Sequence, residues 1–405
     1  MKMKCKINKR TIFGSIVVAV AFSETLKNST TWLYPFIVLF LLVFLYFANL
    51  ASGYGAKRGG YILKKYFKMG IIPYFLIFIY SIILISINKQ GIRFINRSLG
   101  SSLIAIITII TSVSLVYLFK EKAADVLCYG LIINYIMHII INLRVIGISG
   151  LMIHMLNPLN TFQSVFEVHS FGFTLNLLLI FYLSKKGKKN IGIIISILVI
   201  LYLIMKRIAF IGLFFALFVC ILTEIVFRKR SKKKYIIIMW SLVIGSLLYV
   251  AFISLYPQLY QLLMDRLGIL NRYLMANSFS DYYDFDIRFI GRGFGFVSVL
   301  MPDMNIAGAS VEALHNDILK DFIEQGFIGF CIIYYYLFVK VPRVVTWNKS
   351  NRCYGCVTMM LSYTFITLLT DNVLEYVPYT CTLFTLYGII HLYGNQIFSD
   401  TQKIH

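Results

Sequence analysis

The sequence predicts an all-α polytopic membrane protein with about 12 transmembrane helices and one long extracytoplasmic loop. Of its 405 residues, 59% belong to the apolar set AVILMFWYC and 14% are charged, whereas an ordinary globular domain is about 45–50% apolar and about 25% charged. The apolar residues fall into long runs, and a helix needs about 20 such residues to cross a bilayer. This composition excludes collagen, a coiled coil, a disordered chain and a disulfide-rich secreted scaffold.

The apolar runs of the chain are the predicted spans. They cover 11–23, 32–52, 69–87, 101–119, 124–143, 169–184, 190–205, 208–227, 235–256, 321–340, 354–370 and 379–396. The runs 11–23 and 169–184 are short for a bilayer core of roughly 30 Å. The number of spans can therefore change by one pair without changing the functional interpretation.

The basic residues predict how these spans are oriented. The net charge is +22, and most of the 39 Lys and Arg residues lie between alternate spans, in segments such as 185–189 and 228–234. Because basic loops resist translocation, we predict that these segments and both termini are cytoplasmic. The positive charge is therefore a topology signal, and we expect no nucleic acid as a partner.

One long interruption of the apolar pattern divides the chain. Residues 1–255 form a bundle of spans 1–9, residues 256–320 a large extracytoplasmic loop, residues 321–396 spans 10–12, and residues 397–405 a cytoplasmic tail. The loop and its borders hold seven of the 17 acidic residues. Structureless loops longer than about 12–15 residues are uncommon unless they are functional, so we expect the functional site here.

Two features of the loop are candidates for binding a substrate. The first is a set of arginines: Arg266, Arg272, Arg288 and Arg292. The second is the stretch 291–295, Gly-Arg-Gly-Phe-Gly. Such a turn-forming patch, which begins with Gly291 and Gly293, lets the backbone approach a ligand or a neighbouring helix closely.

The segment after the loop opens a helix at a histidine. His315 lies at or just before the first turn, with Asn316 or Asp317 available as the N-cap. A helix N-terminus offers free amide donors and a partial positive charge, which suits an anion. The residues alone leave two interpretations open: a functional histidine, or one that merely caps a helix at the membrane surface.

A second polar pair lies between spans seven and eight. Lys206 and Arg207 are flanked by apolar runs with almost no loop between them. A cation at the centre of a bilayer costs roughly 2.5–3.5 kcal/mol on insertion scales, and such residues often mark sites. The alternative is that both side chains extend to the lipid headgroups.

Other chemistry-bearing patterns are weak. Cys353 and Cys356 form a C-x-x-C pair without a second pair, so we predict no metal and no cofactor. Asp284 and Asp286 form a D-x-D, which we interpret as a solvated acidic stretch. The sequence has no Walker lysine motif and no Gly-x-Ser-x-Gly, which leaves ATP-driven transport and serine hydrolysis unsupported.

These polar islands, in this order, resemble the O-antigen ligase and O-antigen polymerase superfamily, including the Wzy-type polysaccharide polymerases. The strongest element is a His-Asn-x-x-Leu-x-x-x-x-Glu-x-Gly-x-x-Gly string, matched from His315 through Glu324 and Gly326 to Gly329. A basic turn at 206–209 and the glycine patch at 291–295 precede it. The motifs cover roughly residues 190–345, and the remainder resembles the family only in topology.

The resemblance implies metal-independent glycosyl transfer on the outer face of a bacterial cytoplasmic membrane. The donor would be an oligosaccharide repeat on undecaprenyl pyrophosphate, and the acceptor a sugar hydroxyl on another lipid-linked repeat. A flippase and a chain-length regulator usually work beside such an enzyme, so both are possible partners in addition to the lipid bilayer.

The resemblance also implies roles for individual residues. His315 would position or deprotonate the acceptor hydroxyl, while Arg207 and Arg272, helped by Lys206, would bind the pyrophosphate, because guanidinium forks suit phosphate. Other residues would bind substrate: Arg266, Arg288, Arg292, Gly291 and Gly293. A last group would support His315 or its helix: Asn316, Asp317 and Glu324. Either Arg272 or Arg266 can supply the loop arginine, and Arg272 has the better spacing from the glycine patch.

Two other functions remain open at this point. A ligase of the same family would transfer a finished glycan to a lipid, protein or wall acceptor with the same catalytic parts. A lipid-linked-oligosaccharide flippase would also have about 12 spans, but it should distribute charges through the bundle interior. Here the spans are almost free of charge, which favours an enzyme.

Overall fold

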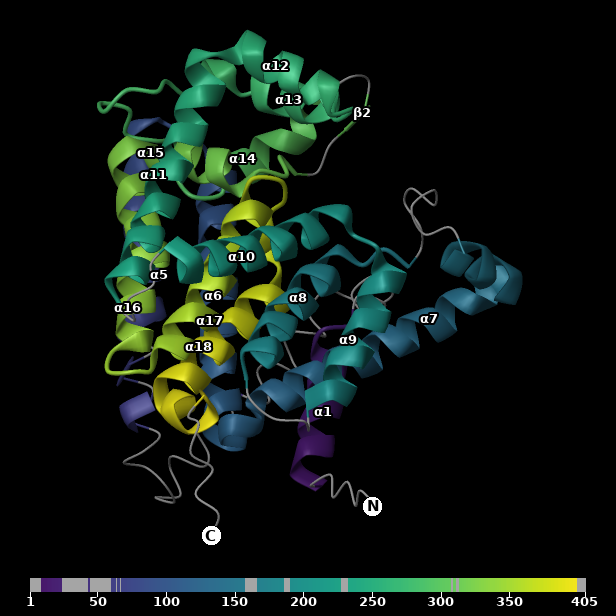
Figure 1. Cartoon of the computed structure of the whole chain (residues 1–405). Helices are drawn as coiled ribbons and strands as arrows, with labels where there is room; N and C mark the ends of the chain where they lie inside the picture. Colours follow the sequence, from purple (N-terminus) through teal and green to yellow (C-terminus); the bar gives the residue numbers. More distant parts are fainter. Residues whose placement is uncertain are drawn as a thin grey trace, which may run out of the picture.

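The computed structural model is almost entirely helical (Figure 1). It describes residues 9–23, 43, 60–62, 64–65, 67–156, 166–185, 190–226, 232–306, 309–310 and 313–398. The predicted span 32–52, apart from one residue, and the predicted cytoplasmic tail, apart from its first two residues, lie outside this described part. Each of the other predicted spans corresponds to a helix.

The first half of the chain supplies apolar helices and short connecting turns. They are α1 (Lys9–Ala21), η1 (Phe67–Ile71), α5 (Ile72–Ile87), α6 (Ile92–Phe119), η2 (Lys120–Lys122), α7 (Ala123–Leu156), α8 (His169–Ser184), α9 (Ile191–Ile204), α10 (Arg207–Val226) and α11 (Lys233–Leu255). Hydroxyl side chains inside α6 donate to carbonyls one turn earlier, as Thr108 does to Ile104 and Thr111 to Ile107. Such bonds satisfy polar groups within an apolar helix.

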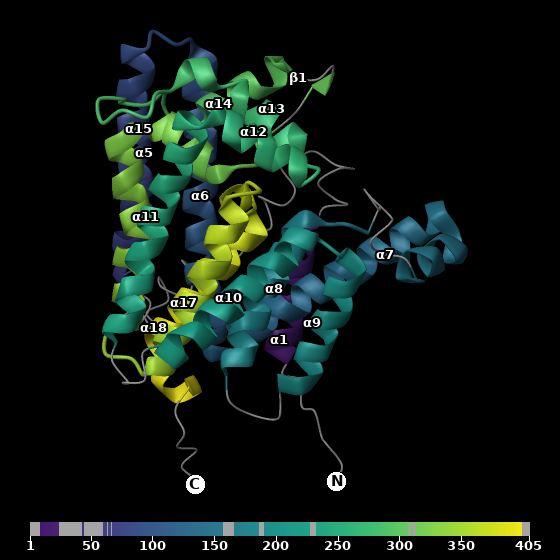
Figure 2. The same ribbon diagram turned by 45° about the horizontal axis from the view of Figure 1, so that its top comes forward.

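The predicted loop is folded rather than irregular. It contains α12 (Pro257–Arg266), α13 (Leu270–Asn277), η4 (Ser280–Tyr282), α14 (Phe296–Leu300), η5 (Met301–Asp303) and the antiparallel two-residue strands β1 (Asn305–Ile306) and β2 (Ala309–Ser310). Figures 1 and 2 show these elements together at one end of the molecule, beyond the ends of α11 and α15.

The C-terminal helices complete the bundle. They are α15 (Asp317–Tyr335), η6 (Tyr336–Lys340), α16 (Val341–Thr346), α17 (Asn351–Leu368), η7 (Val373–Glu375) and α18 (Val377–Phe398). Helix α17 packs against α10, α8 and α11, and α18 packs against α6 and α8. The last helices therefore lie in the centre of the bundle and contact the earlier helices α6, α8, α10 and α11.

Two helix boundaries differ from the prediction. Helix α6 begins at Ile92, and α7 continues to Leu156 with non-helical backbone at Gly147. The added segments carry charged residues such as Arg97 and Arg144. Those residues lower the local hydropathy, which ends an apolar run in the sequence before the helix itself ends.

The apolar outer surface is consistent with an all-α membrane protein. Within the described part, five helical stretches are long and apolar enough to cross a membrane. They are Lys68–Ile87, Ile92–Leu156, Arg207–Ile225, Lys233–Leu255 and Asp317–Thr346. Helices α8 and α9 are apolar but shorter. Large side chains such as Phe214 and Phe218 of α10 are 66% and 60% exposed, as expected of a lipid-facing helix and not of a soluble one.

Candidate active site

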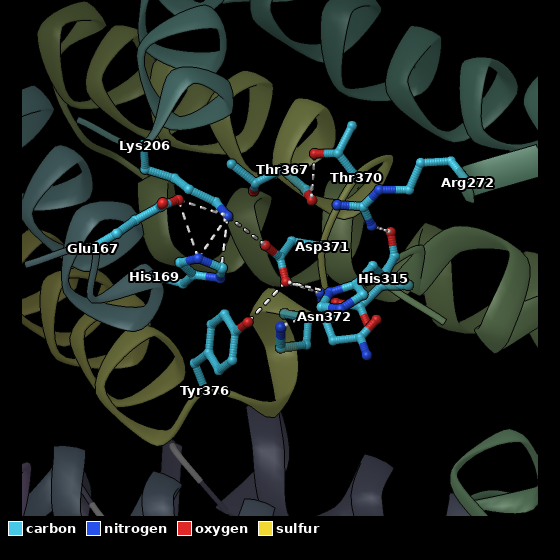
Figure 3. A network of polar contacts seen from close by, with 12 residues as sticks. Glu167, His169, Lys206, Arg272, His315, Thr367, Thr370, Asp371, Asn372 and Tyr376 are labelled. Atoms are coloured by element: carbon cyan, nitrogen blue, oxygen red, sulfur yellow. Dashed lines mark hydrogen bonds and ion pairs between the residues drawn. The ribbon is translucent and has the colours of Figure 1, made fainter. Parts of the chain in front are cut away.

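Polar side chains from distant parts of the sequence meet at the end of the bundle that faces α12–α14 (Figure 3). Glu167 and His169 lie at the start of α8, and Lys206 lies in the break between α9 and α10. Arg272 is carried by α13. His315 precedes α15, and the turn between α17 and α18 supplies a further group that starts with Asp371.

His315 and Asp371 form the centre of the site. The Nδ1 atom of His315 lies 3.4 Å from Oδ1 of Asp371. The same oxygen accepts hydrogen bonds from the Tyr376 hydroxyl at 2.8 Å and from the backbone N–H of Asn372 at 2.9 Å. Asp371 is fully buried, whereas the His315 side chain is 31% exposed. The histidine is therefore accessible, while its carboxylate partner is held in place from behind.

The surroundings of Asp371 keep it ionised. Burial by itself acts to raise its pKa, but four effects outweigh burial and hold the pKa of Asp371 well below its usual range. They are the hydrogen bond from His315, the charge of that imidazole when it is protonated, the charge of Lys206 and the Tyr376 hydroxyl. A carboxylate beside Nδ1 favours the tautomer with a proton on that atom. That assignment, made from the hydrogen-bond pattern, leaves Nε2 of His315 free to accept a proton.

The backbone presents His315 in an unusual conformation. Its φ is +53°, in the left-handed region that costs a residue other than glycine about 1–3 kcal/mol. The next residue, Asn316, is the N-cap of α15: its Oδ1 accepts from the N–H of Leu319 at 3.0 Å, and its Nδ2 donates to the Tyr249 hydroxyl at 2.9 Å. The predicted helix start is thus confirmed, and His315 lies before the N-cap, outside the helix.

Lys206 lies on the other side of Asp371. Its Nζ is 3.9 Å from Oδ2 of Asp371, 3.3 Å from Oε1 of Glu167 and 2.9 Å from Nε2 of His169. Burial lowers the pKa of Lys206, and the charges of Asp371 and Glu167 act against that shift. Burial also acts to raise the pKa of Glu167, but contacts with His169 and Lys206 outweigh it and lower that pKa. The result is a compact group of mixed charge.

The break between α9 and α10 gives Lys206 its position. Met205 ends α9 in a left-handed conformation, with φ +44°. Asn176 of α8 donates to the carbonyl of Ala209 at 3.3 Å, which ties the start of α10 to α8. Because the two helices change direction here, one cation of the predicted basic pair points into the site. That cation is Lys206, while Arg207 is exposed at the first residue of α10.

Arg272 closes the site on the side of the folded loop. Its Nη1 donates to the backbone carbonyl of His315 at 2.9 Å. Within the described residues, the other guanidinium nitrogens of Arg272 have no hydrogen-bond partner. Arg266, the other candidate, is exposed at the end of α12, and Arg288 is exposed as well. Arg272 is therefore the loop arginine that the fold brings to His315.

The glycine patch contacts helices instead of the site. A Cβ atom at Gly291 would lie 2.5 Å from the backbone N of Gly326, and one at Gly293 would lie 2.9 Å from Ile85 of α5. Arg292 donates to the Tyr282 carbonyl at 2.9 Å and to Oδ1 of Asn88 at 3.0 Å. In the structure, Gly291, Gly293 and Arg292 thus take part in packing, and their role in binding substrate stays a prediction.

Two of the residues expected to support His315 act at different places. The Oδ2 atom of Asp317 accepts from the backbone N–H of Leu374 at 3.1 Å, which fixes the turn that carries Asp371. Glu324 accepts instead from the N–H of Val297 at 3.1 Å, at the start of α14. Asp317 thus positions the partner of His315, while Glu324 holds the folded loop on α15.

Sequence reasoning missed Asp371, Tyr376 and Glu167. A weak signal for Asp371 exists, because it directly follows the apolar run 354–370 and is followed by Asn372. An acidic residue at that boundary is also typical of an ordinary helix end, so the pattern does not select it. Its pairing with His315, 56 residues away, is visible only in the fold.

The arrangement allows acid–base chemistry on a substrate that carries an anion. A histidine with a carboxylate partner can accept a proton, and Lys206 and Arg272 lie close enough to contact a phosphate group near it. Among the described residues, no group of three or more His, Cys, Asp and Glu side chains is placed to hold a metal ion. No protein-family model matches the chain, and no curated protein matches its sequence.

Proposed function

We propose that this protein is a membrane-embedded glycosyltransferase that polymerises oligosaccharide repeat units carried on undecaprenyl pyrophosphate. The reaction takes place on the outer face of the cytoplasmic membrane. In this proposal both termini are cytoplasmic and α12–α14 lie outside. The proposal joins the resemblance of the His315–Gly329 string with the site geometry. It needs a donor whose leaving group is a pyrophosphate and an acceptor that is a sugar hydroxyl.

One observation carries the proposal. His315, Asp371, Lys206 and Arg272 come from segments far apart in the sequence, yet they gather at one end of a helical bundle. Burying charges in an apolar protein costs free energy, so such residues often mark a functional site. A base with an orienting carboxylate, flanked by two cations, is the set of groups that transfer from a pyrophosphate requires.

In the proposed step, the acceptor hydroxyl attacks the anomeric carbon of the donor. The carbon–oxygen bond to the pyrophosphate breaks, and its electron pair leaves with the pyrophosphate. The hydroxyl proton moves to Nε2 of His315, and Asp371 stabilises the imidazolium that forms. Arg272 and Lys206 stabilise the charge that develops on the leaving group, a type of stabilisation that is commonly the largest catalytic term. The proton then passes to water.

The direct test is the size distribution of lipid-linked and surface glycans in cells that lack the gene and carry variants of it. General-base assistance is worth about 10²–10⁴-fold, so His315→Ala should nearly abolish chain growth. His138→Ala, which changes a histidine of α7 that contacts Asn142, is the matched control and should give a normal ladder. Normal polymer from stably expressed His315→Ala protein would contradict the assignment.

The same experiment separates the alternative functions. Single repeats exported to the outer leaflet without a ladder indicate a polymerase. A full ladder retained on undecaprenyl pyrophosphate indicates a ligase, and repeats that accumulate only on the inner leaflet indicate a flippase. In the last case the role of His315 is wrong as well.

A further inference from the structure

A second histidine–carboxylate pair lies beside the candidate site (Figure 3). Glu167 precedes α8 and His169 is its first residue. The Oε1 atom of Glu167 lies 3.1 Å from Nε2 of His169, and the side chains are 23% and 39% exposed. The proposed transfer step uses neither residue, so the function of this pair needs an explanation of its own.

Lys206 connects this pair to the pair of His315 and Asp371. Its Nζ lies 3.3 Å from Oε1 of Glu167 and 3.9 Å from Oδ2 of Asp371, so two carboxylates share one ammonium group. With both imidazoles neutral, these two carboxylates balance the charges of Lys206 and Arg272. An anion that binds at Lys206 therefore meets the negative charge of Glu167 as well.

The contact between Lys206 and His169 depends on the charge of the imidazole. Nζ of Lys206 lies 3.1 Å from Nδ1 and 2.9 Å from Nε2 of His169. An ammonium group only donates hydrogen bonds, and an imidazole can accept one only while it is neutral. Protonation of His169 thus removes its acceptor for Lys206 and turns its contact with Glu167 into a charge-assisted hydrogen bond. The two protonation states favour different partners for Glu167.

Other titratable groups surround His169 and Lys206. Among the described residues they are Glu167 before α8, His154 of α7, Lys206 between α9 and α10, Arg272 of α13, His315 before α15, and Asp371 and Tyr376 after α17. Burial acts to raise the pKa of Glu167, but its contacts with His169 and Lys206 outweigh burial and lower that pKa. Glu167 therefore stays ionised near neutral pH, where histidine is the side chain that ordinarily changes charge.

We propose that Glu167 and His169 are positioning residues that control the charge of Lys206, because the binding of an anionic substrate is coupled to proton uptake by His169. Without the anion, Glu167 pairs with Lys206. With the anion, one proton from solvent binds His169, the imidazolium takes over Glu167, and Lys206 pairs with the anion. No covalent bond changes, and the proton returns to solvent when the anion leaves. The inference rests on the proposed function, because it takes the anion to be the pyrophosphate of the lipid-linked donor.

Calorimetric titration with inorganic pyrophosphate tests this coupling without turnover. The full-length protein in lipid nanodiscs is titrated in two buffers that differ in ionisation enthalpy, which gives the number of protons taken up for each pyrophosphate bound. We expect the wild type to take up more protons than His169→Asn, which cannot be protonated at this position. The protonation of pyrophosphate itself is common to both proteins, so the difference isolates His169. His138→Asn, which changes a histidine that contacts Asn142 of α7, should behave as wild type.

The pH dependence of the affinity gives the same coupling from the other side. If anion binding favours the protonated histidine, then lower pH must favour anion binding by the same amount. Between about pH 8 and about pH 6, the affinity of the wild type should therefore rise more steeply than that of His169→Asn. Equal slopes and equal proton uptake in these two proteins would overturn the proposal.

A carboxylate variant separates this role from a structural one. Glu167→Gln keeps the shape of the side chain but no longer competes for Lys206, so we expect pyrophosphate to bind roughly 5-fold more tightly or better. Weaker binding by a folded, monodisperse Glu167→Gln protein would show a structural role and overturn the proposal. Glu224→Gln is the matched control, because it also removes a carboxylate from a buried lysine, Lys234. It should leave pyrophosphate binding unchanged.

Two further variants separate this proposal from the proposed function. Lys206→Ala should abolish the coupled binding, and coupling that persists in it would place the pyrophosphate elsewhere and overturn the proposal. The coupling should persist in His315→Ala. If it does and His315→Ala still makes polymer, the role of Glu167 and His169 holds while the enzymatic proposal fails. If His315→Ala makes no polymer but the wild type shows no coupling, only the present inference fails.

Discussion

Two regions of this protein contain parts of the same motif string, and they are built in opposite ways. The candidate site around His315 consists of side chains, is partly accessible and contains several charged groups. The junction around Gly326 consists of backbone: the N–H groups of Arg292 and Gly293 donate to the carbonyls of Ile323 and Glu324, where α15 is interrupted by φ +68° at Gly326. The first half of the string thus supplies the side chains of the candidate site, and the second half shapes the helix that follows them.

The comparison explains why the glycines of the two motifs belong together. The interruption at Gly326 frees carbonyls in the middle of α15, and the glycine patch approaches closely enough to satisfy them. Polar backbone groups inside an apolar protein need such partners. The folded loop is therefore fixed to α15, which in turn fixes α13 and Arg272 relative to His315.

The largest expected effect comes from the partner of His315. Asp371→Asn keeps the shape of the side chain, and its amide oxygen can still accept from Tyr376, Asn372 and Nδ1–H of His315. It removes the negative charge that stabilises the imidazolium, and its N–H₂ group replaces the oxygen that faces Lys206. We expect polymerisation to fall by about 10²–10⁴-fold, measured as repeat units joined per time in isolated membranes. Asp284→Asn, which changes an exposed carboxylate, is the control. Equal activity of both variants would remove Asp371 from the mechanism.

The second effect tests the junction. A Cβ atom at Gly326 would lie 2.3 Å from the carbonyl carbon of Ile290, and the positive φ adds strain. We expect Gly326→Ala to destabilise the protein by roughly 3 kcal/mol or more, observed as loss of folded, monodisperse protein in detergent. At Gly100 nothing lies within 4 Å of an added Cβ. Gly100→Ala should therefore behave as wild type, and a stable Gly326→Ala protein would contradict the role of the junction.

A smaller effect distinguishes the two loop arginines. Arg272→Lys keeps a positive charge but loses the planar fork, so we expect the rate to fall by about 10–100-fold, which corresponds to one charge-assisted hydrogen bond. Arg266→Lys should be silent, because Arg266 is exposed. The same assay in membranes measures both. The opposite result, a silent Arg272→Lys with an inactive Arg266→Lys, would mean that the wrong arginine was chosen.

The smallest effect concerns stability against acid. Because the pKa of Asp371 is lowered in the folded protein, its ionised form stabilises the fold at pH values above the unfolded pKa of about 3.9. This contribution is lost as the pH falls toward the folded pKa. The melting-temperature difference between wild type and Asp371→Asn should therefore be constant from about pH 7 to 5 and shrink below about pH 4. A difference that grows in acid would reverse the sign of the coupling.

The helices and the start of α15 follow from local features of the sequence. Apolar runs and an N-cap are local: each depends on residues within a few turns, and the helices from α8 to α11 begin and end within about two residues of the predicted spans. The sequence also placed His315 ahead of its helix and gave Arg272 the better spacing, and the fold then brought Arg272 to His315. The function and the number of membrane crossings stay predictions.

Which residues contact one another in the site depends on the packing of the helices. The contact between His315 and Asp371 joins the ends of α15 and α17, and no local pattern encodes it. The break between α9 and α10 places Lys206 beside Asp371 and leaves Arg207 exposed, and the close approach of two backbones packs the glycine patch against α15. The physical reason is that these contacts depend on how whole helices pack. Helix packing follows from the shape of every face in the bundle and not from the spacing within one segment.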